Sequence, residues 1–218
     1  ILSEKCPGTM AEKTSVPSAN VFAKPASLTT AEAAALGTSW LTAYSLLFDA
    51  AGIKPGDSVL IQGAGGGVST AAIQLAHAAG LEVFVTSRDA DKRAKALKLG
   101  ANAALETGAR LPRKVDAVIE SVGAATWGHS VRSVRPGGTI AICGATTGAE
   151  LTRLFFQDIR VQGCTMGSRE DFARLLRFVE HADLHPVIDS VVSGLDAAPE
   201  AFARMIAGDM FGKIVIEL

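Results

Sequence analysis

The stretch Ser58-Val-Leu-Ile-Gln-Gly-Ala-Gly-Gly-Gly-Val-Ser69 decides the fold class of this chain. Its apolar first half is typical of a buried strand, and its glycines lead directly into a predicted helix over residues 68–79. A glycine turn between a strand and a helix leaves free N–H groups at the positive helix end, where a pyrophosphate binds. A flexible loop is the alternative, but two further strand–helix units follow at the expected spacing. The residues predicted to bind the cofactor here are Gly65, Gly66, Gly67 and Val68.

Strand and helix signals alternate on both sides of this turn. Continuous apolar strands separated by helices are typical of a parallel sheet covered on both faces. Right-handed crossovers then predict a doubly wound α/β Rossmann sheet with the strand order 3-2-1-4-5-6. Later strand and helix signals, from residue 187 onward, exceed what this sheet needs, and we assign them partly to a second, incomplete domain. The six predicted strands are 58–62, 82–86, 103–105, 115–120, 139–143 and 159–165. A first helix is predicted to start near residue 30, with Thr29 or Thr30 as its cap. The further predicted helices are 38–50, 68–79, 90–99, 169–182 and 197–207.

The end of the second strand favours NADP(H) over NAD(H). An acidic residue there would hold the ribose hydroxyls of NAD, but the strand ends in Thr86-Ser87-Arg88, and Lys92 follows one helical turn later. A hydroxyl, a guanidinium and an ammonium group suit a 2′-phosphate. Asp89 leaves alternatives open, because it is able to pair with either cation or to cap the helix. A solvated helix start is the other interpretation of the same residues.

Composition indicates an ordinary globular protein and excludes several partners. The chain has 218 residues and a formal net charge of −1, which argues against nucleic acid or an anionic membrane as the main partner. It contains neither a secretory signal nor an apolar run of the roughly 18 residues that a membrane span requires. Three widely spaced cysteines are typical of a reducing cytoplasm, and no zinc-binding motif occurs, so zinc is not supported by the residues present. We therefore expect a cytoplasmic protein.

Several motifs resemble the medium-chain dehydrogenase/reductase superfamily, particularly its quinone-oxidoreductase-like and zinc-type alcohol dehydrogenase branches. The glycine turn is one of them, and the resemblance covers essentially the whole chain. It implies that residues 1–26 are the end of a barrel-like catalytic domain that is mostly missing. Residues 27–183 would form the dinucleotide-binding domain, and residues 184–218 would return to the catalytic domain. The other matching segments are Leu41-Thr-Ala-Tyr44, Asp116-Ala-Val-Ile-Glu-Ser-Val-Gly123, Arg135-Pro-Gly-Gly138, Gly163-Cys-Thr-Met-Gly-Ser168 and Gly212-Lys-Ile-Val215.

The resemblance also implies where the cofactor lies. Met166 and Gly167 would close over the nicotinamide ring, and Lys213 would reach the pyrophosphate. Zinc ligands of zinc-type members lie chiefly in the first domain, and no histidine of this chain matches a catalytic position, so no catalytic residue is assigned. The residues expected near the nicotinamide are Thr42, Ser121, Val122, Gly144, Ala145 and Thr146.

Hydride transfer between NADP(H) and a carbonyl, enone, quinone or alcohol is therefore the predicted function, with a small-molecule substrate. An NAD-dependent zinc-type alcohol dehydrogenase and a non-catalytic dinucleotide-binding module remain alternatives. A methyltransferase-type site is disfavoured, because the second strand lacks a terminal acid for ribose. The sixth strand would be an exposed apolar sheet edge, so we also predict a homodimer that pairs residues 159–165.

Overall fold

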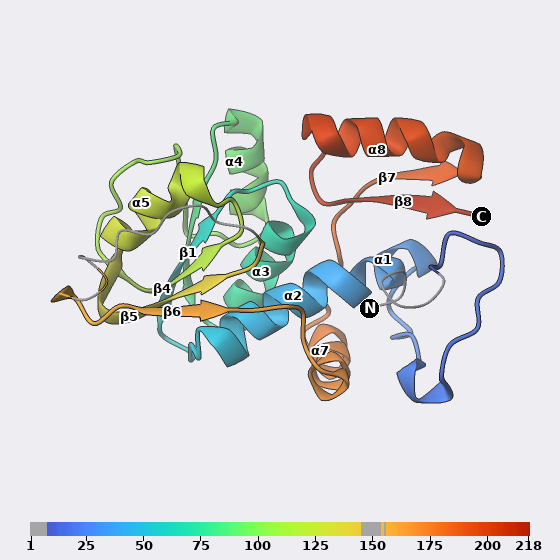
Figure 1. The fold of residues 1–218 in the computed structure, drawn as a ribbon, viewed down its shortest axis with the longest axis horizontal. Coiled ribbons are helices and arrows are strands. Elements are labelled where there is room, and N and C mark those ends of the chain that lie inside the picture. Colours follow the sequence, from blue (N-terminus) through green and yellow to red (C-terminus); the bar gives the residue numbers. More distant parts are fainter. Residues whose placement is uncertain (1–7, 145–153, 155) are drawn as a thin grey trace.

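A computed structural model describes residues 8–144, 154 and 156–218 of the chain. Its centre is a six-stranded parallel sheet in the order β3-β2-β1-β4-β5-β6, which confirms the predicted Rossmann topology (Figure 1). The first four strands match the predicted bounds, because each is a short apolar run between clear turn residues. The strands are β1 (Ser58–Gln62), β2 (Glu82–Thr86), β3 (Ala103–Leu105), β4 (Val115–Glu120), β5 (Val134–Ile142) and β6 (Arg160–Gly163).

Helices cover both faces of the sheet. Alternate residues of a strand point to opposite faces, so Val59 and Ile61 join one buried cluster while Leu60 joins the other. The first cluster packs under α3 (Gly67–Ala78), α4 (Ala90–Lys98) and α7 (Arg169–His181), which all contribute apolar side chains to it. The second packs under α5 (Ala124–Ser133), mainly through Trp127 and Val131.

The two helices expected before β1 form one continuous helical segment. It begins as α1 (Thr30–Ala35), passes through π-helical turns and α2 (Leu41–Tyr44), and ends at Ala50. Thr29 and Glu32 form a capping box at its start, as the sequence predicts for a helix beginning here. Gly37 lies inside the segment without ending it, because its backbone keeps helical hydrogen bonding through a π turn.

Two elements differ from the sequence-based expectation. Helix α5 carries Gly128 and has no side-chain cap, so its sequence gives a weak helical signal, yet Trp127 and Val131 anchor it to the sheet. Strand β5 begins at Val134, ahead of the expected residue 139, and its pairing register with β4 shifts between Val115 and Ala117. Gly138 permits this, because a Cβ there would lie 2.7 Å from the carbonyl oxygen of Asp116.

The C-terminal elements form a smaller unit beside the main sheet. Strands β7 (Ile188–Ser193) and β8 (Lys213–Glu217) pair in parallel, and α8 (Ala198–Ala207) connects them (Figure 1). His185, just before β7, lies 2.8 Å from the Glu32 carboxylate and ties this unit to α1. Among the described residues, no helix has the length and apolar character needed to cross a membrane.

An ion pair fixes the start of β1 and makes stability depend on pH. Asp116 accepts hydrogen bonds from the backbone and side chain of Ser58 and from Arg135. Burial would raise the pKa of Asp116, but the hydrogen bonds from Arg135 and Ser58 outweigh it and lower the pKa from 3.8 to about 2. The folded state therefore gains stability above the unfolded pKa and loses it as the pH falls from about 4 towards 2.

We expect Asp116→Asn to lower the free energy of unfolding at pH 7 by about 1–2 kcal/mol, allowing for solvent screening at the half-exposed Arg135. The deficit should shrink as the pH falls below about 4 and vanish below pH 2, since the native carboxyl is then protonated too. Urea unfolding across this pH range measures both effects, with Glu180→Gln as an exposed control. A deficit that stays constant with pH would show that the carboxylate charge is not what stabilises this contact.

Candidate functional site

A cavity of about 430 Å³ opens at the carboxyl ends of β1, β2 and β4. In open α/β sheets, ligands bind at this edge, beside the point where the strand order reverses. Here that point lies between β1 and β4, because β2 and β3 follow on one side of β1 and β4, β5 and β6 follow on the other. The sheet therefore positions the cavity where the sequence predicts a ligand site. Its lining residues are Gly63, Ala64, Gly65, Gly66, Ser87, Arg88, Lys92, Thr107, Val122, Ala125, Thr126, Met205, Gly208 and Met210.

The glycine turn forms a wall of bare backbone at the start of α3. Gly66 is the N-cap of α3, has an extended φ of −79°, and provides no side-chain cap. The first intrahelical bond runs from the Thr70 N–H to the Gly66 carbonyl, so the N–H groups of residues 67–69 have no backbone partner in the described chain. Among the described residues, a Cβ on Gly66 would touch only the Ser69 hydroxyl, at 3.6 Å. Free donors, a positive helix end and open space together suit an anionic ligand.

Two lysines lie across the same turn. The side chain of Lys92 covers Gly65, where a Cβ would lie 2.8 Å from its Cδ, and its Nζ donates to the Gly208 carbonyl at 2.6 Å. Lys213 covers Gly67 in the same manner, with its Cδ 2.6 Å from the Cβ position. Both predicted cations therefore lie beside the helix start, although the ammonium of Lys92 already has a carbonyl partner.

Arg88 and Ser87 lie at the rim of the cavity, at the end of β2. Arg88 is exposed and lines the cavity, and no acidic side chain of the described residues pairs with it. Ser87 is buried, and its hydroxyl accepts a hydrogen bond from the Asp89 N–H at 3.2 Å. Asp89 caps α4 by accepting from the N–H groups of residues 91 and 92, and the backbone bond from residue 92 contributes most to lowering the pKa of Asp89. Of the roles that the sequence leaves open for Asp89, the structure shows the helix cap.

A buried polar network fixes the strand ends beneath the cavity. Gln62, at the end of β1, donates to Ser130 at 2.9 Å and accepts from the Thr86 hydroxyl at 2.5 Å. Ser130 in turn donates to the Glu120 carboxylate at 2.6 Å. Glu120 is fully buried and also accepts from the N–H groups of Val122 and residue 123, both at 2.9 Å. A buried network in which every polar group has a hydrogen-bond partner is held in a single geometry. Glu120 therefore positions the loop that carries Val122.

The C-terminal unit closes one side of the cavity. Met205 from α8 and Met210 from the following loop line it, and the Gly212 N–H donates to the Gly65 carbonyl at 2.9 Å. Sequence reasoning missed both methionines, because their proximity to the glycine turn arises from contacts across more than 130 positions of the chain. The polar ends of apolar strands, Gln62 and Glu120, are a local signal that would have identified the network.

Thr42, Ser121 and Gly144, which were also predicted to lie near the cofactor, are not among the residues that line this cavity. Thr42 is buried in α2, and its hydroxyl donates to the Thr38 carbonyl at 2.7 Å. Ser121 follows β4, is exposed, and its hydroxyl lies 3.4 Å from the Gln62 carbonyl. Gly144 follows β5 with a left-handed φ of 91°, and Ala145 and Thr146 lie outside the described residues.

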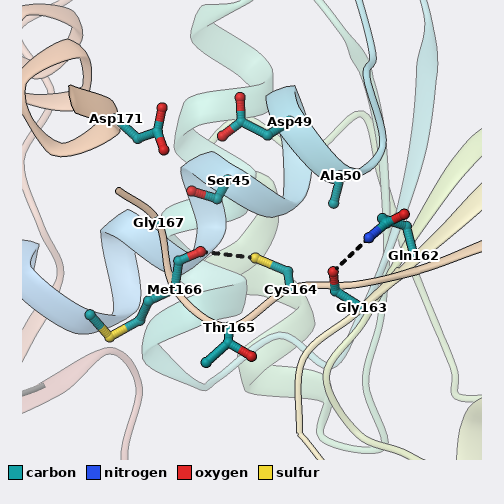
Figure 2. Close-up of a pocket in the computed structure, with 10 residues that line it drawn as sticks. All are labelled: Ser45, Asp49, Ala50, Gln162, Gly163, Cys164, Thr165, Met166, Gly167 and Asp171. Carbon is teal, nitrogen blue, oxygen red and sulfur yellow. Dashed lines mark hydrogen bonds between the residues drawn. The ribbon is translucent and has the colours of Figure 1, made fainter. Parts of the chain in front are cut away.

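Met166 and Gly167 line a second cavity, of about 390 Å³, at the end of β6 (Figure 2). Met166 has a left-handed φ of 55°, and its carbonyl accepts a hydrogen bond from the Cys164 thiol at 3.1 Å. Gly167 packs so tightly against α2 that a Cβ would collide with Leu41. The structure therefore places these two residues in a cavity separate from the one at the glycine turn.

The thiols near β6 are poor nucleophiles. Burial raises the pKa of Cys164 to about 11, with a smaller contribution from Cys143, and burial also raises the pKa of Cys143. Both therefore stay protonated near neutral pH, as expected for structural cysteines. Within the described ranges, no three acidic, histidine or cysteine side chains gather in a way that would hold a metal ion.

Comparison with known proteins gives consistent results. A family model described as zinc-binding dehydrogenase matches residues 67–181. A zinc-type alcohol dehydrogenase-like protein of Leptosphaeria maculans is 31% identical over 94% of this chain and 63% of its own length. The 2-methylene-furan-3-one reductase of Solanum lycopersicum is 34% identical over 96% of this chain and 52% of its own.

A solved structure titled NAD-dependent alcohol dehydrogenase superposes on the whole chain with a TM-score of 0.92 and 35% identity, and the match covers 67% of that protein. The chain thus spans between about half and two thirds of the length of these relatives.

Proposed function

Because this chain belongs to the zinc-binding dehydrogenase family, we propose that it binds a nicotinamide dinucleotide in the cavity at the glycine turn. The protein would transfer hydride between this cofactor and a small carbonyl, enone, quinone or alcohol. The observation that carries the proposal is the uncapped start of α3, where free N–H groups follow the open backbone of Gly66 and a lysine lies on either side. A bound nicotinamide supplies the hydride chemistry, and the protein supplies binding and orientation.

Residues around the cavity divide the binding task. The N–H groups that follow Gly66 would hold the diphosphate, with Lys92 and Lys213 on either side of the turn. Thr107 and Arg88 line the part of the cavity beyond β2, where the adenosine half would lie. Val122, held in place by Glu120, would contact the cofactor from the end of β4. These side chains position the cofactor, and no residue is assigned to proton transfer.

NADP(H) is the cofactor that we propose, since Arg88 offers a guanidinium that no described residue pairs with, beside the buried Ser87 hydroxyl. An NAD-dependent alcohol dehydrogenase is the second candidate, because a structure with that title is 35% identical. The carbonyl contact of Lys92 lessens its value for a 2′-phosphate and makes Arg88 the decisive residue.

Replacing Gly66 with valine should abolish dinucleotide binding without unfolding the protein. The branched side chain would fill the space that the diphosphate needs, whereas the protein around Gly66 has room for a Cβ. We expect an affinity loss of about a hundredfold or more, from several charge-assisted hydrogen bonds. Calorimetric titration with NADPH measures it, and Gly66→Ala should give an intermediate loss. Full affinity in a folded Gly66→Val variant would place the cofactor elsewhere. Measuring substrate turnover together with cofactor binding distinguishes an enzyme from a protein that binds the dinucleotide without catalysing a reaction.

Replacing Arg88 with alanine should weaken NADPH binding about five- to tenfold and leave NADH binding nearly unchanged. A partly exposed charge-assisted contact contributes on the order of 1 kcal/mol, and only NADPH carries the 2′-phosphate. Added salt should reduce the difference, since ions screen exposed charges. Arg177→Ala on α7 removes the same charge far from the cavity and is the control. Equal losses for both cofactors would contradict the NADP(H) assignment.

We further propose a homodimer through β6. All of Arg160–Gly163 is exposed at the edge of the six-stranded sheet, and unpaired edges of this kind favour strand pairing. Sedimentation at micromolar concentration should give a dimer, and Val161→Pro, which removes an N–H from the edge, should shift it towards monomer. A wild-type monomer at that concentration would contradict this arrangement.

A further inference from the structure

A third cavity, of about 440 Å³, is lined by the loop that follows β3 and by the C-terminal half of α5. Of the described residues that line it, four are cationic and none is acidic, although the whole chain carries a net charge of −1. Its polar lining residues are Arg110, Arg113, Lys114, His129, Arg132 and Ser133. Like charges held together in one concave site repel one another, and an anion in the cavity relieves this repulsion.

Two of the cations are held in place by other parts of the protein. Lys114 donates to the carbonyls of Arg132 and Val134 at 2.9 and 3.1 Å, which neutralises the negative end of α5. Arg113 forms an ion pair with Glu82. These contacts hold the cavity wall in place. The Lys114 ammonium also offsets the partial negative charge at the end of α5, which would otherwise repel an anion.

The other two cations are free to bind a ligand. Arg110 and Arg132 are exposed, and within the described part of the chain neither guanidinium group has a hydrogen-bonding or ionic partner. They come from two different walls of the cavity, one from the loop after β3 and one from α5. Buried His129 joins these walls through a 2.9 Å contact between its Nε2 and the Ala109 carbonyl. The two guanidinium groups therefore belong to one preformed site.

We propose that this cavity binds a small phosphate-bearing anion, independently of any dinucleotide at the glycine turn. Guanidinium groups bind phosphate oxygens through paired, charge-assisted hydrogen bonds, and Arg110 and Arg132 supply two such groups. The volume suits a small molecule, because ligand pockets typically measure ≈ 300–1,000 Å³. The two cavities share no lining residue among those described: Thr107 and Thr126 line the one at the glycine turn, whereas Arg110 and His129 line this one.

Isothermal calorimetric titration of the 218-residue chain with inorganic pyrophosphate, at low ionic strength, tests the proposal. The double variant Arg110→Gln/Arg132→Gln should lower the affinity about tenfold or more. The control Arg174→Gln/Arg177→Gln removes the same charge from α7 and should change it by less than about twofold. Thermal unfolding confirms that each variant folds.

Gly66→Val separates this site from the glycine turn, where pyrophosphate also has donors. Binding that persists in Gly66→Val and is lost in the Arg110/Arg132 double variant supports the proposal, whether or not the chain binds a dinucleotide. Binding that Gly66→Val abolishes belongs to the glycine turn and overturns it. Equal losses of affinity in the two double arginine variants would also overturn it, because general surface charge would then explain the binding. A wild-type chain that does not bind pyrophosphate would overturn it as well.

Discussion

The unsatisfied N–H groups at the start of α3 are the constraint on which the rest of this structure depends. Gly66 caps the helix without a side chain, so nothing within the described protein satisfies donors that would otherwise be paired. Natural helices usually carry serine, threonine, aspartate or asparagine at this position, and α4 and α7 do so with Asp89 and Ser168. The absence of such a cap at α3 leaves the helix end free for a ligand.

The surroundings of α3 are organised around this free end. Glu120 and Gln62 hold the ends of β4 and β1 in a fully paired network, which keeps the floor of the cavity rigid. The C-terminal unit reaches the turn through the bond from Gly212 to Gly65 and through Lys213 above Gly67. Elements from the middle of the chain and from its C-terminal unit therefore converge on one small area, and the proposed function follows from what that area would attract.

Local patterns predicted most of the fold. β1, the glycine turn and α3 were predictable because the apolar run, the turn residues and the helical residues are adjacent in the chain. The order of strands in the sheet followed from the rule that parallel strands are joined by right-handed crossovers. Helix α5 escaped prediction, since Trp127 and Val131 stabilise it by packing and its intrinsic propensity is weak. Met205, Met210 and the carbonyl partner of Lys92 come from contacts over long sequence separations, which no local pattern encodes.

Backbone amide exchange at the start of α3 tests the central claim most directly. The N–H groups of Gly67, Val68 and Ser69 are the ones that the described structure leaves without a backbone partner. Saturating NADPH should slow their hydrogen exchange in the 218-residue chain, along with that of the Gly208 region that closes the cavity. Unchanged exchange at residues 67–69 under saturating cofactor would contradict the account, because the helix start would then not be the binding site.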